Sequence, residues 1–321
     1  MNSIRAIVVD PSVTGRLAIN EVESPKAGPS EALVEVQAIS LNRGEVRDVM
    51  EAKAGWRPGW DLAGTVIKQA ANGTGPKVGS RVVGMVHVHG GAWAEQVAVP
   101  TNMLAEIPTN VSFAQAATLP VAGLTALYTA LYALDKGGLL LHKRVLITGS
   151  TGGVGLFAHQ LARHSGAYVV GTARNVRNEA IVREAGADEV IMGDDISSAR
   201  AHGPYHLIID SVGGKTLASA ISLLAKGATC IIMGWSASDE VTIDIKDLIT
   251  TGGITLYGLN MFEEFNHRDG SEDLARLAQM VAEQKLHTPI EVEASWHEIG
   301  NVAQRLLQRQ FTGKAVLHLN R

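Results

Sequence analysis

A glycine-rich segment constrains the fold of this chain more than any other feature. It runs Gly149, Ser150, Thr151, Gly152, Gly153, Val154 and Gly155. The segment follows the apolar run 144–148 and precedes a stretch of helical period with Leu156 and Leu161 on its apolar face. A turn without side chains lets a diphosphate approach a helix amino terminus, where backbone N–H groups and the helix dipole favour negative charge. Glycines alone also suit an ordinary turn. A second strand within about 30 residues favours a dinucleotide site.

The region from 121 to 259 has the pattern of parallel βαβ units. Apolar runs of four to six residues alternate with longer stretches of helical period. Strands that helices cover on both faces have this uniformly apolar character. The six runs are 145–148, 167–172, 189–192, 206–210, 228–233 and 254–259. They predict an α/β fold with a Rossmann-type doubly wound parallel sheet.

The residues before about 120 have a different pattern. Short alternating runs, separated by glycine and proline, are typical of antiparallel strands; examples are 32–36, 81–86 and 95–99. We therefore predict a mostly β domain over 1–120 and a nucleotide-binding domain over 121–261. The segment 262–321 is predicted to complete the first domain.

The carboxyl-terminal segment reads as two helices and two strands. Leu274, Leu277 and Val281 recur at helical spacing, and Ser271 is placed to cap that helix. The predicted elements are a helix over 271–286, a strand over 290–292, a helix over 299–309 and a strand over 315–319.

Charge and composition exclude several classes of protein. The 321 residues carry a net charge of -4, which argues against nucleic acid and membrane surfaces as partners. A single cysteine, Cys230, lies in an apolar run and forms neither an internal disulfide nor a Cys-rich metal site. The amino-terminal apolar core 6–9 is too short for a secretory signal. The uncharged stretch 107–134 is broken at Pro120, so we expect a short helix, a break and a buried helix in a cytoplasmic protein.

The end of the second predicted parallel strand indicates which nicotinamide cofactor is used. Enzymes that use NAD place an Asp or Glu there to bind the ribose hydroxyls. This chain has Ala173 instead, followed by Arg174 and, farther on, Arg177. Arginine pairs well with a 2′-phosphate through charge-assisted hydrogen bonds. The pattern favours NADPH. The alternative is that Arg174 is an ordinary solvated charge.

Several ordered motifs resemble the medium-chain dehydrogenase/reductase superfamily, most closely its zinc-free quinone oxidoreductase branch. They are the segments 117–126 (ATLPVAGLTA), 145–155 (VLITGSTGGVG) and 209–214 (IDSVGG), and the closing Gly313-Lys314. The resemblance spans nearly the whole chain. It implies a GroES-like β domain, a Rossmann domain and a cofactor lying in the cleft. It also implies a homodimer or homotetramer.

The resemblance also predicts that this chain lacks zinc. The three catalytic zinc ligands of the alcohol dehydrogenases in this superfamily correspond to Asn42, Trp60 and Val121 here, and amide, indole and isopropyl groups cannot rebuild that site. The remaining metal candidate is His87 with His89, whose alternation would place both rings on one face of a strand. Two histidines are too few for a catalytic zinc. We therefore expect no metal.

The resemblance assigns roles to individual residues. Asn42 corresponds to an asparagine near the nicotinamide, whose amide could hydrogen-bond a cofactor or substrate oxygen, and Arg47 replaces a family tyrosine near the substrate. Thr125 and Arg309 correspond to residues that contact the cofactor. The ordinary alternatives are a turn residue for Asn42, a hydroxyl bonded to its own helix for Thr125 and a solvated charge for Arg309. The predicted cofactor-binding set also includes Thr172, Asn175, Ser211, Gly234 and Trp235, with Ser236 beside it at the same sheet edge.

Without a metal, the chemistry narrows to activated acceptors. Reduction of an unactivated ketone commonly needs a Lewis acid, whereas a quinone or an α,β-unsaturated carbonyl delocalises the incoming charge. We therefore predict an NADPH-dependent quinone or enone reductase whose small-molecule acceptor is held at near-attack distance. The alternatives are an NADPH-binding crystallin-like or regulatory protein with little turnover, enoyl-thioester reduction and medium-chain alcohol oxidation.

Overall fold

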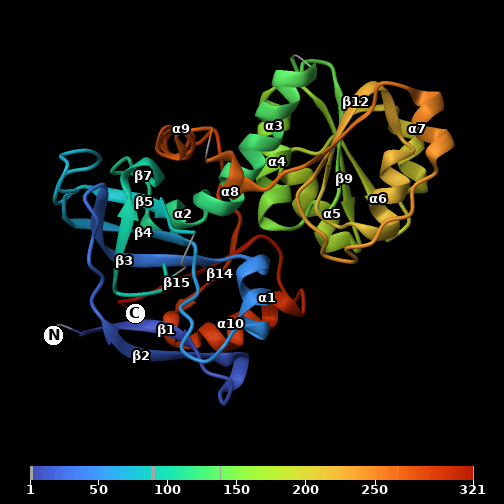
Figure 1. The fold of residues 1–321 in the computed structure, drawn as a ribbon. Helices are drawn as coiled ribbons and strands as arrows, with labels where there is room; N and C mark the ends of the chain where they lie inside the picture. Colours follow the sequence, from blue (N-terminus) through green and yellow to red (C-terminus); the bar gives the residue numbers. More distant parts are fainter. Residues whose placement is uncertain (1–2, 88–90, 138, 266, 321) are drawn as a thin grey trace. The chain divides into compact units, whose positions relative to one another are not determined.

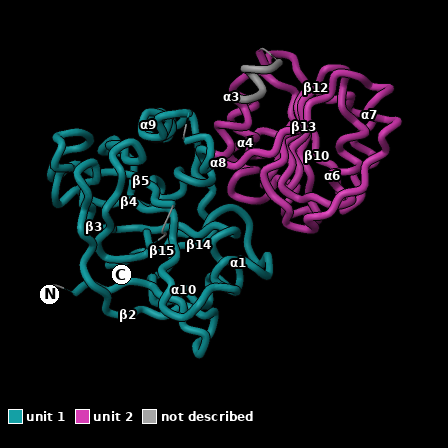
Figure 2. The backbone as a smooth tube through the Cα atoms, in the orientation of Figure 1, with its two compact units in different colours: residues 1–124, 262–321 teal, residues 125–261 magenta. Residues whose placement is uncertain are grey.

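The chain forms two compact units. The computed structural model describes residues 3–87, 91–137, 139–265 and 267–320, with the backbone alone over 131–137. Unit 1 comprises residues 1–124 and 262–321, and unit 2 comprises residues 125–261 (Figure 2). Each unit has its own sheet and its own hydrophobic core.

Unit 2 is built on a parallel sheet with the strand order β10-β9-β8-β11-β12-β13. Every neighbouring pair in that order is parallel. The strands are β8 (Arg144–Ile147), β9 (Tyr168–Ala173), β10 (Glu189–Met192), β11 (Tyr205–Asp210), β12 (Leu224–Ile232) and β13 (Thr255–Gly258). The order reverses between β8 and β11, and open α/β sheets bind ligands at such a switch point. The predicted doubly wound sheet is confirmed.

Helices flank this sheet on both sides (Figure 1). They are α3 (Leu124–Gly137), α4 (Gly153–His164), α5 (Val176–Glu184), α6 (Gly214–Ile221) and α7 (Ile245–Thr251). The uniformly apolar runs of the sequence become buried strand residues, including Leu146, Ile208 and Cys230. Burial of these side chains from water is what holds helices against sheet.

Unit 1 contains a mixed β sheet. Its strands come from segments that are far apart in the sequence. Its main path is β14-β15-β3-β4-β5-β7, and β6 also pairs with β3, while β1 and β2 form a separate antiparallel pair. The strands are β1 (Ser3–Val9), β2 (Leu17–Glu23), β3 (Glu31–Leu41), β4 (Asp61–Lys68), β5 (Arg81–Met85), β6 (Gln96–Pro100), β7 (Leu104–Glu106), β14 (Ile290–Ser295) and β15 (Lys314–His318). β3 pairs antiparallel with β4, β6 and β15, whereas β14 pairs parallel with β15. The predicted GroES-like β fold is confirmed.

The helices of unit 1 are short, except for α9. They are α1 (Arg43–Glu51), α2 (Phe113–Ala117), α8 (Met261–Glu264), α9 (Gly270–Ala282) and α10 (Ile299–Leu307). Short 3-10 turns cover Thr14–Arg16, Thr101–Met103, Ser197–His202 and Trp296–Glu298, the third of them in unit 2. The predicted cap of α9 was wrong: Asp269 caps it by accepting from the Ser271 N–H at 2.9 Å. A carboxylate two residues earlier suits the positive end of the helix dipole.

The long uncharged stretch around Pro120 is helical in three pieces. α2 ends at Ala117, a π-helical turn covers Leu119–Gly123, and α3 follows directly. Proline removes a backbone donor, and the wider turn accommodates its ring without ending the helical path. Among the residues that the structure describes, no helix has both the length and the apolar character needed to span a bilayer.

Candidate functional site

The glycine-rich segment turns from β8 into α4 at the carboxyl end of the parallel sheet. Gly149 has φ +61°, a conformation that favours glycine. Gly152 is the N-cap of α4, and its lack of a side chain leaves the start of the helix without a side-chain cap. The first N–H groups of a helix have no acceptor inside it. The N–H groups of Gly153, Val154 and Gly155 are therefore placed to bind an anion.

Two of these glycines serve different purposes. A Cβ on Gly155 would lie 2.6 Å from the Gly149 carbonyl oxygen and 2.7 Å from that of Ser150, so only glycine allows this close packing. A Cβ on Gly152 would meet only the Gly149 oxygen at 3.4 Å, and Gly152 is exposed. The turn is thus packed on its inner side and open on its outer side. This geometry fits a diphosphate, which needs backbone N–H groups without side chains around them.

Ser150 attaches the glycine turn to the neighbouring strand. Its buried hydroxyl donates to the Ile147 carbonyl at 2.7 Å and accepts from the Thr172 N–H at 2.8 Å. Thr151 beside it is half-buried. Because the single hydroxyl proton of Ser150 is already donated within the protein, the side chain holds the turn in place.

A buried carboxylate fixes the loop after β11 against the same edge. Asp210 accepts from the Thr148 hydroxyl at 2.5 Å and from the N–H groups of Val212 and Gly213 at 3.1 and 2.8 Å. Burial raises the pKa of Asp210, while these hydrogen bonds oppose the rise. Sequence reasoning did not single out Asp210 or Thr148. The signal that could have found Asp210 is a carboxylate ending an apolar run.

Ser211, which follows β11, and Gly234, which follows β12, lie close together at this edge. A Cβ on Gly234 would lie 3.2 Å from the Ser211 carbonyl oxygen, so the two loops touch. Trp235, the next residue, is 53% exposed, and the Ser236 N–H donates to the Ser211 carbonyl at 3.1 Å. Trp235 therefore lies at the surface beside the candidate cofactor edge.

Arg174 and Asn175 follow the end of β9 at the surface. The Nε atom of Arg174 lies 2.7 Å from Asp194 Oδ1, and these side chains are 50% and 82% exposed. The Asn175 side chain caps α5 by accepting from the Asn178 N–H at 2.9 Å. Asp194 lies two residues after the end of β10. The arginine predicted to bind a 2′-phosphate thus forms an exposed ion pair.

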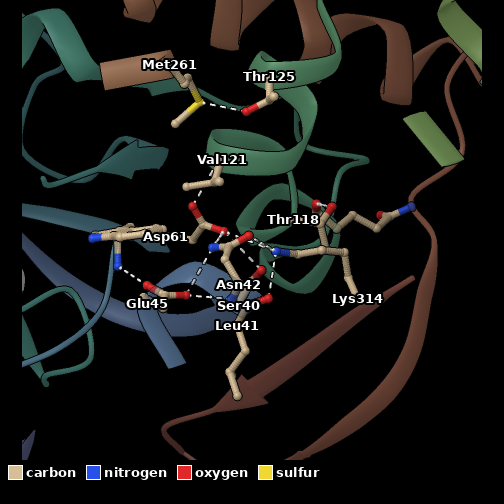
Figure 3. Close-up of polar contacts among 12 residues, drawn as sticks. Ser40, Leu41, Asn42, Glu45, Asp61, Thr118, Val121, Thr125, Met261 and Lys314 are labelled. Atoms are coloured by element: carbon tan, nitrogen blue, oxygen red, sulfur yellow. Dashed lines mark hydrogen bonds and ion pairs between the residues drawn. The ribbon is translucent and has the colours of Figure 1, made fainter. Parts of the chain in front are cut away.

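Thr125 lies buried in the first turn of α3. Its hydroxyl donates to the Met261 sulfur at 3.1 Å, within unit 2 (Figure 3). The predicted contact of Thr125 with the cofactor stays a prediction.

In unit 1, Asn42 lies at the centre of a buried charged cluster (Figure 3). Its Oδ1 accepts from Lys314 Nζ at 2.6 Å. Its Nδ2 donates to Asp61 Oδ2 at 2.8 Å and to Glu45 Oε1 at 3.0 Å. Asn42 also caps α1, with its own N–H donating to Glu45 Oε1 at 2.6 Å. We call Asn42, Glu45, Asp61 and Lys314 the Asn42 cluster.

Two carboxylates and one ammonium share this cluster, away from water. Glu45, Asp61 and Lys314 are all buried, and Lys314 Nζ lies 3.4 Å from Asp61 Oδ2. Burial, followed by the nearby Asp61, raises the pKa of Glu45. Burial lowers the pKa of Lys314, against the opposing effect of Asp61 and Glu45. Sequence reasoning missed the cluster, although a lysine opening the apolar run 315–319 was a signal.

The three positions that correspond to zinc ligands in the resemblance meet at this cluster. Asn42 contacts both carboxylates, the Trp60 N–H donates to Glu45 Oε2 at 2.8 Å, and the Val121 N–H donates to Asp61 Oδ1 at 3.0 Å. Within the described residues, no group of three or more His, Cys, Asp or Glu could hold a metal. His87 stacks on Phe262 with ring centroids 3.5 Å apart, while His89 lies outside the described residues.

Arg47 lies one turn after Arg43 on α1, near a further arginine. The Arg43 guanidinium donates to the carbonyls of Leu306 and Leu307 at 3.1 Å, which joins α1 to the end of α10. Burial, followed by the charges of Arg309 and Arg47, lowers the pKa of Arg43. Arg309 is exposed, with φ +58°. We call Arg43, Arg47 and Arg309 the arginine cluster.

Comparison with known proteins agrees with this architecture. Residues 28–109 match the alcohol dehydrogenase GroES-like domain, and residues 153–283 match the family described as zinc-binding dehydrogenase. The chain is 30% identical to the chloroplastic quinone-oxidoreductase QR1 of Triphysaria versicolor, with 98% of each chain covered. The quinone oxidoreductase structure from Coxiella burnetii is 25% identical, with a TM-score of 0.84 over 99% of this chain and 100% of that one. A mycobacterial protein complexed with NADPH has a TM-score of 0.85 at 23% identity over 98% and 99%.

The two-domain fold and these matches define the class. The chain belongs to the medium-chain dehydrogenase/reductase superfamily, and its relatives within it are quinone oxidoreductase-like proteins. Both expectations from the sequence motifs are confirmed at this level. Because QR1 is described as chloroplastic, the cytoplasmic location stays a prediction.

Proposed function

We propose that this protein is an NADPH-dependent oxidoreductase that transfers hydride to a quinone or an α,β-unsaturated carbonyl compound without zinc. The open turn at the start of α4, where Gly152 leaves free space before N–H groups that no side chain caps, is the observation that carries the proposal. When bound, NADPH supplies the hydride from its nicotinamide ring. The residues of this chain bind the cofactor and the acceptor, orient them and exclude water from the site.

The choice of NADPH rests on the end of β9. Ala173 offers no carboxylate that would repel a 2′-phosphate or bind the ribose hydroxyls of NAD. Arg174 follows it, and its exposed pair with Asp194 belongs to a class that contributes about 0–1 kcal/mol. A 2′-phosphate, with its larger charge, can therefore displace Asp194 from Arg174. The mycobacterial protein of the same fold was found with NADPH, which supports this choice.

The acceptor class rests on the residues around the Asn42 cluster. Asn42, Trp60 and Val121 offer no thiolate, imidazole or carboxylate side chain, the usual zinc ligands. An acceptor that delocalises charge into an enolate or a hydroquinone anion requires less electrophilic help than a simple ketone. Alignment at near-attack distance then supplies much of the rate. The name of QR1 supports the quinone.

Asn42 and Arg47 are the residues that we assign to the surroundings of the acceptor. Arg47 is half-exposed in the arginine cluster with Arg43 and Arg309. A guanidinium there favours negative charge that develops on the reduced acceptor. Arg47 therefore tunes the acceptor preference.

We also propose that the protein is a homodimer formed through the outer edge of unit 2. β13 is the last strand of its sheet, so among the described residues one of its edges has no paired strand. Near it in sequence, Ile245 and Ile249 of α7 are 62% and 74% exposed, and Leu256 of β13 is 38% exposed. An exposed edge strand beside apolar side chains is a common surface for self-association. Light scattering of the wild type and of an Ile249→Glu variant tests this assembly.

The test of function is NADPH consumption with a panel of acceptors. Purified protein is mixed with NADPH or NADH and with quinones, enones, an enoyl thioester and a medium-chain aldehyde, each with and without a zinc chelator. We expect acceptor-dependent oxidation of NADPH with quinones or enones that the chelator does not change. NADPH binding by calorimetry without oxidation of any acceptor would favour the crystallin-like or regulatory alternative. No heat with either nucleotide would overturn the proposal.

A further inference from the structure

The groups around the Asn42 carboxamide are compatible with only one orientation of it. Its oxygen faces an ammonium, Lys314 Nζ at 2.6 Å, and its nitrogen faces two carboxylates, Asp61 at 2.8 Å and Glu45 at 3.0 Å (Figure 3). An amide has an acceptor end and a donor end. Exchanging the ends would point N–H groups at an ammonium and an oxygen at two carboxylates. Charge-assisted hydrogen bonds of this kind are stronger than neutral ones, so the surroundings select a single orientation.

Lys314 acts on Asn42 and has no proton left for a ligand. An ammonium has three protons. Those of Lys314 have three acceptors: the Leu41 carbonyl at 2.9 Å, Asn42 Oδ1 at 2.6 Å and Asp61 Oδ2 at 3.4 Å. The residue is only 2% exposed. Its influence on chemistry therefore passes through Asn42.

The side-chain nitrogen of Asn42 likewise has no proton left for a ligand. Both Nδ2 protons have acceptors, because Asp61 and Glu45 each receive one. The second lone pair of Oδ1 is the hydrogen-bonding capacity that remains. By this count, the oxygen is the polar atom of the half-buried Asn42 side chain with capacity left for a reactant.

Asp61 links the Asn42 side chain to several other segments of the chain. It accepts from the Ser40 hydroxyl at 3.1 Å and from the Val121 N–H at 3.0 Å, in addition to Asn42 and Lys314. Segments from β3, β4, β15 and the π-helical turn are thus joined through one carboxylate. A displacement of Lys314 or Asp61 would move the amide.

We propose that Lys314 and Asp61 are positioning residues that hold the Asn42 carboxamide so that it offers a bound reactant only its oxygen. The partner of Asn42 is then an N–H or O–H group, not a carbonyl oxygen. Asn42 does not stabilise the negative charge that develops on the acceptor oxygen. The kinetic part of this inference rests on the proposed function, and the structural part does not.

The first test observes the amide directly. Full-length protein labelled with ¹⁵N-asparagine gives side-chain NH₂ signals, and the signal absent from Asn42→Ser belongs to Asn42. In the wild type we expect slow exchange of both protons with water, because both are buried in hydrogen bonds. Lys314→Met and Asp61→Asn should each speed this exchange by about tenfold or more. Lys285→Met, which removes an exposed lysine of unit 1, is the matched control and should change nothing.

The second test separates positioning from folding. Steady-state NADPH oxidation with a quinone should show kcat lowered about tenfold to a hundredfold in Lys314→Met, the range that misplacement of a site group produces. The KM for NADPH, whose phosphates we assign to the α4 turn, should stay within about threefold. Lys285→Met should match the wild type.

The possible outcomes distinguish a failure of the positioning role from a failure of the proposed oxidoreductase function. If Lys314→Met keeps both the slow Asn42 exchange and the wild-type kcat, the positioning role is wrong. If Lys314→Met does not fold, Asp61→Asn replaces it, since this change keeps the size of the side chain. A wild type that oxidises no NADPH with any acceptor would overturn the proposed function, and the exchange measurement would still decide the orientation of Asn42.

Discussion

Lys314 donates a hydrogen bond to the side-chain oxygen of Asn42 across 2.6 Å, although 272 positions separate the two residues. The register of the sheet explains the contact. Ala315 pairs with Leu41 in the antiparallel ladder of β15 and β3, so the residues that flank this pair on one side are Lys314 and Asn42. The last strand of the chain thereby contributes to the candidate site.

Replacing Arg174 with alanine should discriminate between the two nicotinamide cofactors. We expect the affinity for NADPH to fall about tenfold or more and that for NADH to change less than about threefold, since only NADPH carries the 2′-phosphate. The melting temperature should hardly change, because the Arg174–Asp194 pair is exposed. Asp194→Asn is the matched control: it frees Arg174 and should leave NADPH binding equal or tighter. Equal losses for both cofactors would exclude the assigned role.

Gly152 and Gly155 should respond differently to a single methyl group. Gly155→Ala places a Cβ 2.6 Å from a carbonyl oxygen, so we expect it to lower the free energy of unfolding by about 1–3 kcal/mol. Gly152→Ala meets one atom at 3.4 Å and should cost about 1 kcal/mol or less.

Cofactor binding distinguishes the same pair of glycines. Gly152→Ala should weaken NADPH about tenfold while the protein remains folded, because the methyl group occupies the open side of the turn. Calorimetric titration and thermal melting measure both quantities. Unchanged NADPH affinity in Gly152→Ala would contradict the diphosphate site.

His159 should make the protein sensitive to acid. The ring is fully buried in α4, and neither nitrogen has a hydrogen-bond partner among the described residues. Burial lowers the pKa of His159 from 6.5 to about 3. Between pH 6.5 and pH 3, His159 is therefore protonated in the unfolded chain but not in the folded chain. The free energy of unfolding falls by about 1.4 kcal/mol per pH unit over this range as the pH drops.

A variant isolates this contribution from that of the carboxylates. Between pH 6.5 and pH 5, His159→Leu should lose about 2 kcal/mol less free energy of unfolding than the wild type does. Urea unfolding across this pH range measures the difference. His164→Leu, on the exposed side of the same helix, is the control and should follow the wild type. Parallel curves for His159→Leu and the wild type would show that His159 is not the group responsible.

Arg47 should affect charged acceptors more than neutral ones. Arg47→Gln removes one cation from the cluster with Arg43 and Arg309, so we expect kcat/KM for a sulfonated naphthoquinone to fall about tenfold. For an uncharged naphthoquinone the change should stay within about threefold. The ratio of the two values at low and moderate salt is the measurement. A ratio equal to that of the wild type would remove Arg47 from the acceptor site.

Much of unit 2 follows from local patterns in the sequence. Each strand there contains an apolar run, and β10 has the predicted bounds 189–192. Such runs are readable because strands covered on both faces need no polar residues. The glycine turn is equally local, since φ +61° at Gly149 and the close approach at Gly155 both require the absence of a side chain.

The sequence alone therefore determined the α/β class, the glycine turn and the lack of zinc-binding side chains at Asn42, Trp60 and Val121, because each depends on residue type and short spacing. The tertiary structure decided which distant residues meet. Lys314, Asp61 and Glu45 converge on Asn42 because strand register and helix placement bring them there, and no local pattern encodes a pairing across hundreds of positions. The tertiary structure likewise places Asp194 beside Arg174. Long-range contacts of this kind depend on the packing of whole elements, and so only the folded chain reveals them.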